Sequence, residues 1–215
     1  MLRIYEIYDS IQGESTFAGM PCTFVRLAGC PLRCSYCDTP QALATDSGSL
    51  VAVEDIVQEV INRNRPLVLV TGGEPLAQHN CLALLQALES LDCEVQLETS
   101  GAFSIASVPA NIHRIVDVKT PSSGEAGRNK LENIPLLNAG DEIKFVLSSR
   151  QDYEWSRAFI AEHQLVRQGC DILFSPAWEL LSAADLSQWI LQDQLPVWMQ
   201  IQLHKVIWGA EATGV

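Results

Sequence analysis

The sequence predicts an α/β fold in which mostly parallel strands form an incomplete barrel with helices on its outside. Short apolar segments alternate along the chain with segments of helical period, and most of the strand-like segments run into turn-forming residues. The chain has 215 residues, whereas a complete eightfold barrel takes about 250. We therefore expect one domain over residues 1–215, with functional side chains at the carboxyl ends of its strands.

The expected strands are short and apolar or alternating. They are residues 4–8, 23–27, 66–71, 93–99, 115–119, 143–148, 170–175 and 197–203. Apolar residues at helical spacing predict helices over residues 53–61, 80–91, 152–169 and 183–194, the second opening on Asn80 as its capping residue. The polar, glycine-bearing stretch 119–135 indicates a long mobile loop.

The charge balance argues against nucleic acid as a partner. The chain has 14 Lys and Arg residues against 26 Asp and Glu residues, a net charge of -12, which has the wrong sign for binding a phosphate backbone. Residues 1–14 carry charges throughout, and no run of 18 apolar residues follows. We expect no signal peptide, no membrane anchor and a cytoplasmic protein.

The seven cysteines fall into two groups. Four of them occur singly among apolar neighbours and are expected to be buried thiols, although Cys22 lies close enough to the other group for ligation to stay open. These four are Cys22, Cys81, Cys93 and Cys170. The other three, Cys30, Cys34 and Cys37, are grouped in the stretch GCPLRCSYCDT, residues 29–39.

Three cysteines at this spacing favour an iron-sulfur cluster with one open iron. A structural zinc site is closed by four ligands, and none of His79, His113, His163 and His204 has a recognisable ligand spacing. A cluster held by three thiolates leaves one iron able to bind a small molecule. A closed zinc site, or a noncatalytic iron-sulfur scaffold, is the alternative.

A second motif follows one strand and one helix later. In LVLVTGGEPL, residues 67–76, an apolar strand runs into Gly72, Gly73, Glu74 and Pro75. Paired glycines let a backbone approach a ligand closely, and a carboxylate at a strand end can accept hydrogen bonds from an ammonium group. An ordinary turn is the alternative interpretation.

These two motifs together resemble those of the radical S-adenosylmethionine (SAM) superfamily. The resemblance implies a 4Fe-4S cluster on Cys30, Cys34 and Cys37, whose free iron chelates SAM and whose reduction releases a 5'-deoxyadenosyl radical. No catalytic side chain is predicted, because the radical comes from the cofactor. The implied SAM contacts are Tyr36, Asp38, Gly73, Glu74, Ser100 and Lys119. A capping serine and a solvated lysine are the alternatives for the last two.

Five segments resemble, more narrowly, the 7-carboxy-7-deazaguanine synthase family: SIQGE (10–14), FVRLAGC (24–30), CDT (37–39), TGGEP (71–75) and QLHKVIW (202–208). Together they span nearly the whole chain. The family converts 6-carboxy-5,6,7,8-tetrahydropterin into 7-carboxy-7-deazaguanine with loss of ammonia, in deazapurine and queuosine precursor biosynthesis, and regenerates SAM. The resemblance also implies a homodimer and an electron donor such as a flavodoxin.

The same resemblance implies residues for the substrate and for magnesium. The backbone of Ile11 and Gly13 and the side chains of Gln12 and Glu14 would read the pterin edge, and Arg26 would clamp the carboxylate. Thr71 and His204 would also face the substrate, and Thr39 would bind magnesium. The alternatives are a turn for SIQGE and Thr39, a surface ion pair for Arg26 and a structural role for His204.

A glycyl-radical activase shares the cysteine spacing and the small size, and it is a further alternative. It acts on a protein loop, so it has no need of a pterin-reading SIQGE segment or of Arg26.

Overall fold

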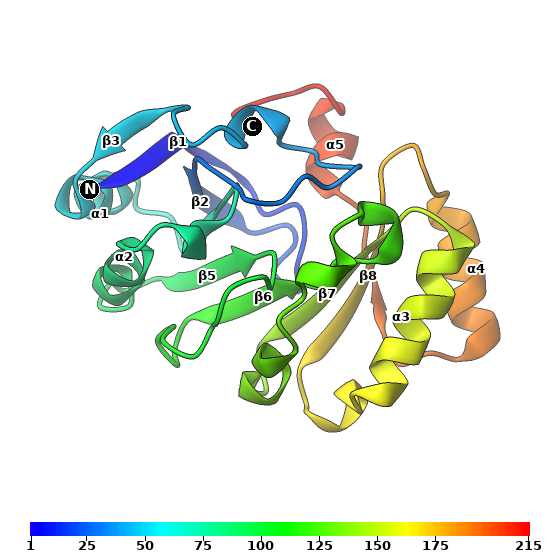
Figure 1. Ribbon diagram of the computed structural model, residues 1–215. Helices are drawn as coiled ribbons and strands as arrows, with labels where there is room; N and C mark the ends of the chain where they lie inside the picture. The colour runs from blue at the N-terminus through cyan, green and yellow to red at the C-terminus, as the bar shows by residue number, and fades with distance from the viewer.

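The computed structural model describes residues 1–215 and contains one nine-stranded sheet. The strand order is β3-β1-β2-β4-β5-β6-β7-β8-β9, with β2 and β4 to β9 parallel and with β1 antiparallel to both β2 and β3. The strands are β1 (Leu2–Ile11), β2 (Pro21–Leu27), β3 (Ser49–Val51), β4 (Leu67–Gly72), β5 (Glu94–Thr99), β6 (His113–Asp117), β7 (Glu142–Leu147), β8 (Asp171–Pro176) and β9 (Trp198–Met199). The sheet curves without closing (Figure 1), which confirms the predicted incomplete barrel.

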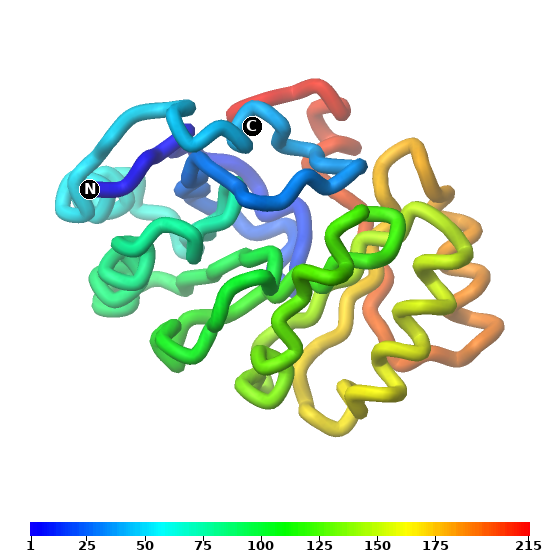
Figure 2. Tube along the Cα trace, viewed as in Figure 1, coloured from blue at the N-terminus to red at the C-terminus, as the bar shows by residue number.

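Five helices accompany the sheet: α1 (Val53–Arg63), α2 (Cys81–Leu88), α3 (Arg150–Glu162), α4 (Ala183–Asp193) and α5 (Leu203–Trp208). In Figure 1, α1 and α2 lie at the left of the view, near the first strands of the sheet, and α3 and α4 lie at the right, near its last strands. The segment after β2, coloured blue to cyan, gathers with α5 and the C-terminus at one end of the molecule (Figure 2). That end therefore brings together residues from both ends of the sequence.

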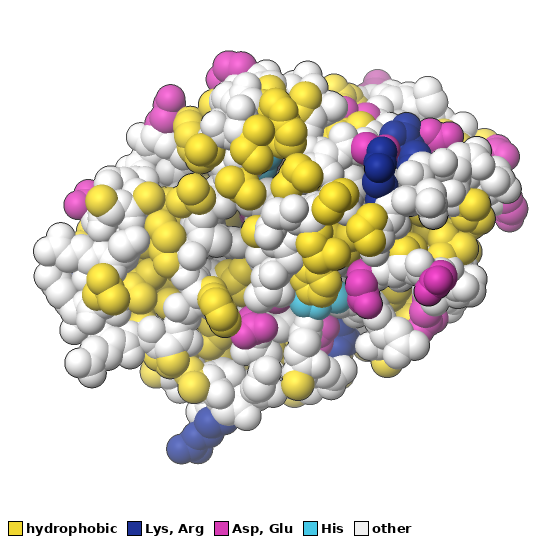
Figure 3. Space-filling view, turned by 180° about the vertical axis from the view of Figure 1, so that it is seen from behind, with side chains coloured by type: hydrophobic (Ala, Val, Ile, Leu, Met, Phe, Trp, Pro, Cys, Tyr) yellow, Lys and Arg dark blue, Asp and Glu magenta, His cyan; other side chains and the backbone are white.

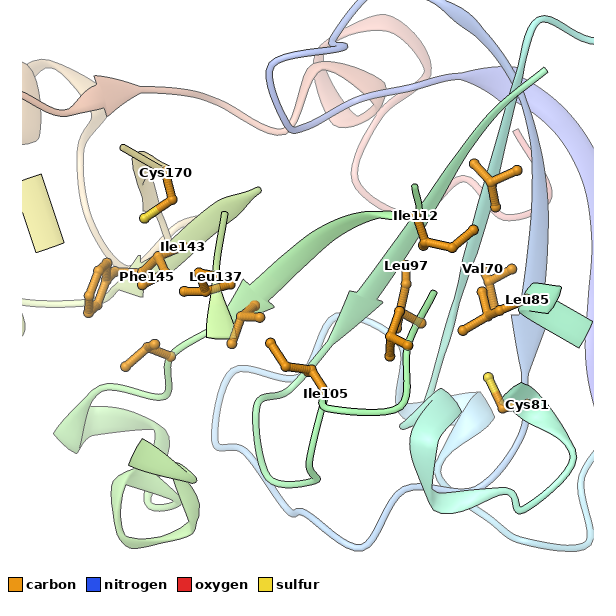
Figure 4. Packing of buried hydrophobic residues seen from close by; sticks show 14 of the residues in the cluster. Val70, Cys81, Leu85, Leu97, Ile105, Ile112, Leu137, Ile143, Phe145 and Cys170 are labelled. Carbon is orange, nitrogen blue, oxygen red and sulfur yellow. The ribbon is translucent and has the colours of Figure 1, made fainter. Parts of the chain in front are cut away.

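The main core lies between the outer face of the sheet and the helices. It contains 33 buried residues, among them Val70, Leu97 and Phe145 from three strands (Figure 4). A second cluster of 5 buried residues, which includes Phe24, Leu69 and Ile115, lies on the other face of the same strands. Because successive side chains of a strand point to opposite faces, these parallel strands are buried on both sides, as their nearly unbroken apolar sequences predict.

The isolated cysteines belong to these packed regions. Cys22, Cys81 and Cys170 are buried, and the last two lie among apolar side chains in Figure 4. Burial raises the pKa of Cys22 to about 12, so this thiol remains protonated at neutral pH. The expectation of buried thiols is confirmed for these three, while Cys93 is half-buried.

Several predicted boundaries are wrong. The segment 197–203 contains only the two-residue strand β9, and helix α5 follows it, so His204 lies in a helix and not at a strand end. Strand β6 ends at Asp117, two residues before Lys119. Asn80 precedes α2 without capping it, because its side-chain amide donates to the Met1 carbonyl 3.1 Å away.

Helix α3 is shorter than predicted and begins earlier. It starts after Ser149, whose hydroxyl accepts a hydrogen bond from the Asp152 backbone N–H, and it ends at Glu162, before Gln164 takes a left-handed conformation. The predicted loop 119–135 contains three 3₁₀ segments. It is held to its own base by Asn129, whose side chain pairs with the Lys119 backbone N–H and carbonyl at 2.8 and 2.9 Å.

Acidic side chains occur at many separate points on the face shown in Figure 3, and Lys and Arg at few, in keeping with the net charge of -12. None of the five helices has the length and apolar character needed to cross a membrane. The single domain over residues 1–215 stays a prediction.

Candidate functional site

The three clustered cysteines lie on the segment that follows β2. Cys30, Cys34 and Cys37 are half-buried, and their thiols form no disulfide. The segment is anchored at its start, where the Gly29 N–H donates to the Ala42 carbonyl at 2.8 Å and the Cys30 N–H donates to the Leu43 carbonyl at 3.2 Å. Burial raises the pKa of each thiol, that of Cys34 to about 11, so these side chains remain protonated until a metal displaces the proton.

The donor set fits an iron-sulfur cluster better than a closed zinc site. The three thiols share one segment of eight residues, from Cys30 to Cys37. No group of three or more His, Cys, Asp or Glu side chains in the molecule is arranged around a point where a single metal ion would sit. Three cysteines without a fourth ligand match a 4Fe-4S cluster with one open iron.

The glycine pair at the end of β4 packs directly against this cysteine segment. The Gly73 N–H donates to the Leu27 carbonyl and the Glu74 N–H donates to the Gly29 carbonyl, both at 2.9 Å. A Cβ atom at Gly73 would lie 2.4 Å from the Gly29 oxygen and 3.0 Å from the Ala42 oxygen, both of them backbone atoms. Gly73 is therefore required for the contact between the two motifs.

Glu74 has a fully buried side chain that accepts hydrogen bonds from the end of β5 and from its own turn. Its carboxylate accepts from the Thr99 hydroxyl at 2.8 Å, from the Ser100 N–H at 2.7 Å, from the Ser100 hydroxyl and from the Leu76 N–H at 2.9 Å. Glu74 and Ser100 are thus in contact, as a shared cofactor site requires. Ser100 caps no helix, and the contact of either side chain with SAM stays a prediction.

Lys119 is mostly buried, which contradicts the solvated-lysine alternative. Its ammonium lies 2.8 Å from an Asp117 carboxylate oxygen, and its side chain is 12% exposed. Although burial alone would lower the pKa of Lys119, the Asp117 carboxylate raises it, so the ammonium stays charged. The second Asp117 oxygen is buried and has no hydrogen-bond partner within the chain. An unsatisfied buried acceptor beside the cysteine segment is available to a bound ligand.

Tyr36 attaches the cysteine segment to β7 and to the residues that follow β6. Its hydroxyl lies 3.1 Å from the Thr120 hydroxyl and donates to the Val146 carbonyl at 3.2 Å. Burial raises the pKa of Tyr36 to about 12, so the hydroxyl keeps its proton at neutral pH. The side chain predicted to contact SAM therefore has a fixed orientation.

The SIQGE segment turns into the barrel from the end of β1. Ile11, the last residue of β1, pairs with Pro21. The Gln12 side chain is buried, and its amide donates to the Gln96 side-chain oxygen at 2.6 Å. This buried contact contradicts the interpretation of SIQGE as a mere surface turn.

Gly13 lies against α5. Its carbonyl accepts from the Leu203 N–H at 2.9 Å, and a Cβ atom at Gly13 would lie 2.3 Å from the His204 imidazole. Burial holds the pKa of His204 below its usual range, so this imidazole is neutral at neutral pH. The structure thus brings His204 to the predicted pterin-reading segment, although from a helix.

Glu14 and Thr71 join a network that the sequence analysis did not identify. The Lys144 ammonium lies 2.8 Å from Glu14 and also donates to Glu98, and the Thr71 hydroxyl donates to Glu98 at 3.0 Å. Lys144 lies between the apolar residues Ile143 and Phe145 of EIKFVL, and Glu98 follows Leu97 in EVQLET, so each is a charged residue within a strand. That interruption was the signal available in the sequence, because a buried charge in a strand is uncommon unless it is paired.

Arg26 and Thr39 lie next to each other. The Arg26 guanidinium bonds Glu6 and the Tyr8 hydroxyl, each at 2.9 Å, and donates to the Thr39 hydroxyl at 3.4 Å. Its side chain is only 16% exposed, so the surface-pair alternative is wrong. In turn, the Thr39 hydroxyl donates to Asp38 at 3.0 Å. The predicted carboxylate clamp and the predicted magnesium ligand are therefore neighbours.

Gln202 connects the two halves of the site. Its side-chain amide donates to Glu14 at 3.0 Å and to Asp38 at 2.9 Å. Glu14 belongs to the predicted pterin-reading segment, and Asp38 directly follows the cysteine run. The predicted substrate and cofactor residues therefore meet at one place.

Replacing Gly13 with alanine tests whether its contact with α5 positions the site. The added Cβ would displace the His204 side chain and would lie 3.1 Å from the His204 backbone nitrogen, so we expect kcat/KM to fall about tenfold, mostly through KM, with a smaller loss of fold stability than Gly73→Ala causes. Steady-state kinetics and thermal unfolding measure the two effects. Gly127→Ala is the matched control, because nothing lies within 4 Å of its Cβ position. Unchanged kinetics in Gly13→Ala would contradict the prediction.

Comparison with known proteins assigns the site to a class. Residues 25–117 match the family model described as Radical SAM superfamily. The 7-carboxy-7-deazaguanine synthase of Chlorobaculum tepidum is 45% identical and covers 100% of this chain and 97% of its own length. That of Koribacter versatilis is 42% identical, with 100% of both chains covered. The crystal structure of QueE from Escherichia coli has a TM-score of 0.77 at 23% identity, with 94% of each chain covered, and shares the fold.

This chain is accordingly a radical SAM enzyme, a class that uses a 4Fe-4S cluster and SAM. The identity of more than 40% over the full length of two relatives then shows its place within the superfamily. The chain belongs to the 7-carboxy-7-deazaguanine synthase family.

Proposed function

We propose that this chain converts 6-carboxy-5,6,7,8-tetrahydropterin into 7-carboxy-7-deazaguanine and ammonia. The observation that carries the proposal is the bridge made by Gln202, which joins Glu14 of the pterin-reading segment to Asp38 beside the cysteine run. A substrate held by Glu14 lies next to the place where a cluster on Cys30, Cys34 and Cys37 would stand. The names of the full-length relatives support the same reaction.

The proposed roles of the side chains follow from their chemistry. Cys30, Cys34 and Cys37 hold the cluster, which with SAM supplies the radical that begins the reaction. Asp117 and Lys119 offer an acceptor and a cation close to each other at the end of β6, suited to the polar groups of SAM. Gly73, which has no side chain, lets the backbone approach SAM closely. Glu74 and Ser100, which are hydrogen-bonded to each other, lie next to it and complete the SAM site.

The substrate is held from two sides in this proposal. Gln12 and Glu14 bind the donor-acceptor edge of the pterin, and Gln96 fixes the orientation of the Gln12 amide. Arg26 binds the substrate carboxylate, since a planar guanidinium can pair with both carboxylate oxygens. Its hydrogen bonds to Glu6 and to the Tyr8 hydroxyl fix its orientation. His204, neutral and half-buried, closes the site over Gly13.

Magnesium is a further part of the proposal. Thr39 offers a hydroxyl, an oxygen ligand of the kind magnesium prefers, and it lies directly after Asp38, a predicted SAM contact. Arg26 lies within hydrogen-bond distance of Thr39, so a carboxylate bound to Arg26 would be close to the metal. The metal would then neutralise and orient the carboxylate of the substrate.

We also propose a homodimer, a flavodoxin-like electron donor and a cytoplasmic location. Val206, Ile207 and Trp208 of α5 are exposed apolar side chains, which support a contact with a second copy. Cys30, Cys34 and Cys37 are only half-buried, which supports reduction of their cluster by a docked electron-donor protein. The seven free thiols fit the reducing environment of the cytoplasm.

An anaerobic assay tests the reaction. Protein with a reconstituted cluster is mixed with dithionite, SAM, magnesium and 6-carboxytetrahydropterin, and 7-carboxy-7-deazaguanine is followed by mass spectrometry. We expect more product than SAM consumed, and much less product when magnesium is omitted. SAM cleavage with intact pterin would reject the substrate and favour the activase alternative, whereas protein that binds zinc and no iron would reject the whole proposal.

A further inference from the structure

Lys144 is a buried cation surrounded by three carboxylates in the interior of the barrel. It lies on β7 between Ile143 and Phe145, which both pack into the main core, so the Lys144 side chain points to the opposite face. The Lys144 side chain is only 5% exposed, and its ammonium contacts Glu14 and Glu98 and lies 3.9 Å from Asp117. Burying a charge is costly, so a cation at this position calls for a role beyond packing.

The register of the sheet places this cation beside the proposed substrate residues. Thr71 on β4 pairs with Arg26 on β2, and Lys144 on β7 pairs with Asp117 on β6. Between them, Glu98 on β5 contacts both Thr71 and Lys144. One layer of inward-facing side chains therefore runs from Arg26 to Lys144, with Glu14 inserted from the SIQGE segment.

Lys144 determines the chemical character of Glu14. Burial alone would raise the pKa of Glu14, but the Lys144 ammonium holds that pKa below its usual range, and Gln202 also donates to this carboxylate. An ionised carboxylate has two oxygens that accept hydrogen bonds and no proton to donate. With one contact from Lys144 and one from Gln202, Glu14 still has acceptor capacity for a ligand.

A carboxylate that only accepts hydrogen bonds favours a ring that presents two adjacent hydrogen-bond donors. A pterin offers them in its 2-amino group and the neighbouring ring N–H, whereas a lumazine has an oxygen in place of the 2-amino group. That oxygen would face the Glu14 carboxylate without a proton between them, and buried acceptors that face each other are disfavoured. A Glu14 that carried a proton could donate to the same oxygen and would lose the discrimination.

We propose that Lys144 is a positioning residue that keeps Glu14 ionised and in place, and thereby makes the site specific for a 2-amino pterin ring over a 2-oxo lumazine ring. The inference rests on the proposed function, because it takes Glu14 as the reader of the pterin edge. Glu98 has the supporting role of holding Lys144 and Thr71 together.

The test is equilibrium binding to reconstituted, SAM-loaded enzyme under anaerobic conditions. The two probes are 6-carboxytetrahydropterin and the 2-oxo analogue, 6-carboxytetrahydrolumazine, and both Kd values are measured by calorimetry. Wild-type enzyme should prefer the pterin by at least about 100-fold. Lys144→Met should weaken pterin binding on the order of 30-fold and lumazine binding hardly at all. In kinetics the loss should appear in KM more than in kcat.

Two further variants separate this specificity role from a structural one. Glu14→Gln keeps the volume but supplies a donor as well as an acceptor, so it should bind the lumazine more tightly than wild type does, whether or not Lys144→Met folds. Arg157→Met removes a cation that is paired with Glu154 and Asp193 on the outer helices, and it should change neither Kd. The SAM-dependent change in the EPR spectrum of the cluster should be retained in every variant.

The outcomes are distinct. Equal weakening of both ligands in Lys144→Met would show a structural effect and overturn the inference, as would a Glu14→Gln variant that still rejects the lumazine. Wild-type enzyme that binds neither ring would instead reject the proposed function. Wild-type turnover of the pterin without discrimination between the two rings would leave the proposed function standing and overturn the inference about Lys144.

Discussion

Replacing Cys34 with alanine is expected to abolish SAM cleavage and product formation. Three thiols on one segment supply all the protein ligands of the proposed cluster. Of the four other cysteines, Cys22, Cys81 and Cys170 are buried in packed regions, and Cys93 lies outside the cysteine segment. A cluster with two protein ligands loses an essential bond, so we expect activity to fall at least about 1,000-fold, to the background of the assay. Iron content and the 4Fe-4S absorption band should fall with it.

The control for Cys34→Ala is Cys93→Ala, which removes another half-buried thiol that lies outside the cysteine segment. Cys93→Ala should keep its iron content and its rate. The fold itself should survive in Cys34→Ala, because the half-buried Cys34 thiol takes part in no disulfide, and circular dichroism would verify this. Wild-type iron content in Cys34→Ala would contradict the assignment of the ligands.

Replacing Gly73 with alanine is expected to have the second largest effect, on both stability and cluster assembly. The added Cβ would lie 2.4 Å from the Gly29 oxygen and 2.6 Å from the Gly29 carbonyl carbon. Backbone atoms cannot rotate away as a side chain can, so β4 and the cysteine segment must move apart, at a cost on the order of 3 kcal/mol in the free energy of unfolding. The hydrogen bond from Glu74 to Gly29 would be lost as well.

Chemical denaturation and iron analysis measure the two effects of Gly73→Ala. We expect a lower denaturation midpoint and incomplete reconstitution, because the segment that carries Cys30 begins at Gly29. Gly127→Ala again provides the matched control, with open space at its Cβ position and no expected change. A Gly73→Ala variant with wild-type stability and iron content would show that the close packing of the two motifs is not required.

Local signals in the sequence were sufficient for the parallel part of the fold. The strands around Val25, Val70 and Ile143 are short apolar runs followed by turns, and they form where they were predicted. The strand predicted at the end of the chain is wrong: VWMQIQL alternates like a strand, but most of it makes no ladder and α5 begins at Leu203. Short segments at a sheet edge depend on tertiary contacts, such as that between Leu203 and Gly13, more than on their own pattern.

The cysteine run and the glycine pair were recognisable because their function depends on residues a few positions apart. Their packing against each other was not, since it depends on a backbone contact between Gly73 and Gly29. Gln12 was identified from its segment, but Gln96, which orients it, is 84 residues away. A partner that distant leaves no local trace in a single sequence.

The sequence alone therefore determined the chemistry this protein can hold: three thiols for a cluster, a strand ending in GGE, and an amide and a carboxylate in SIQGE. Only the tertiary structure decided how these groups act together, because the sheet register sets Thr71, Glu98 and Lys144 in one inward-facing layer. The physical reason is that a buried charge is stable only beside its partners. Those partners are adjacent across strands and far apart along the chain.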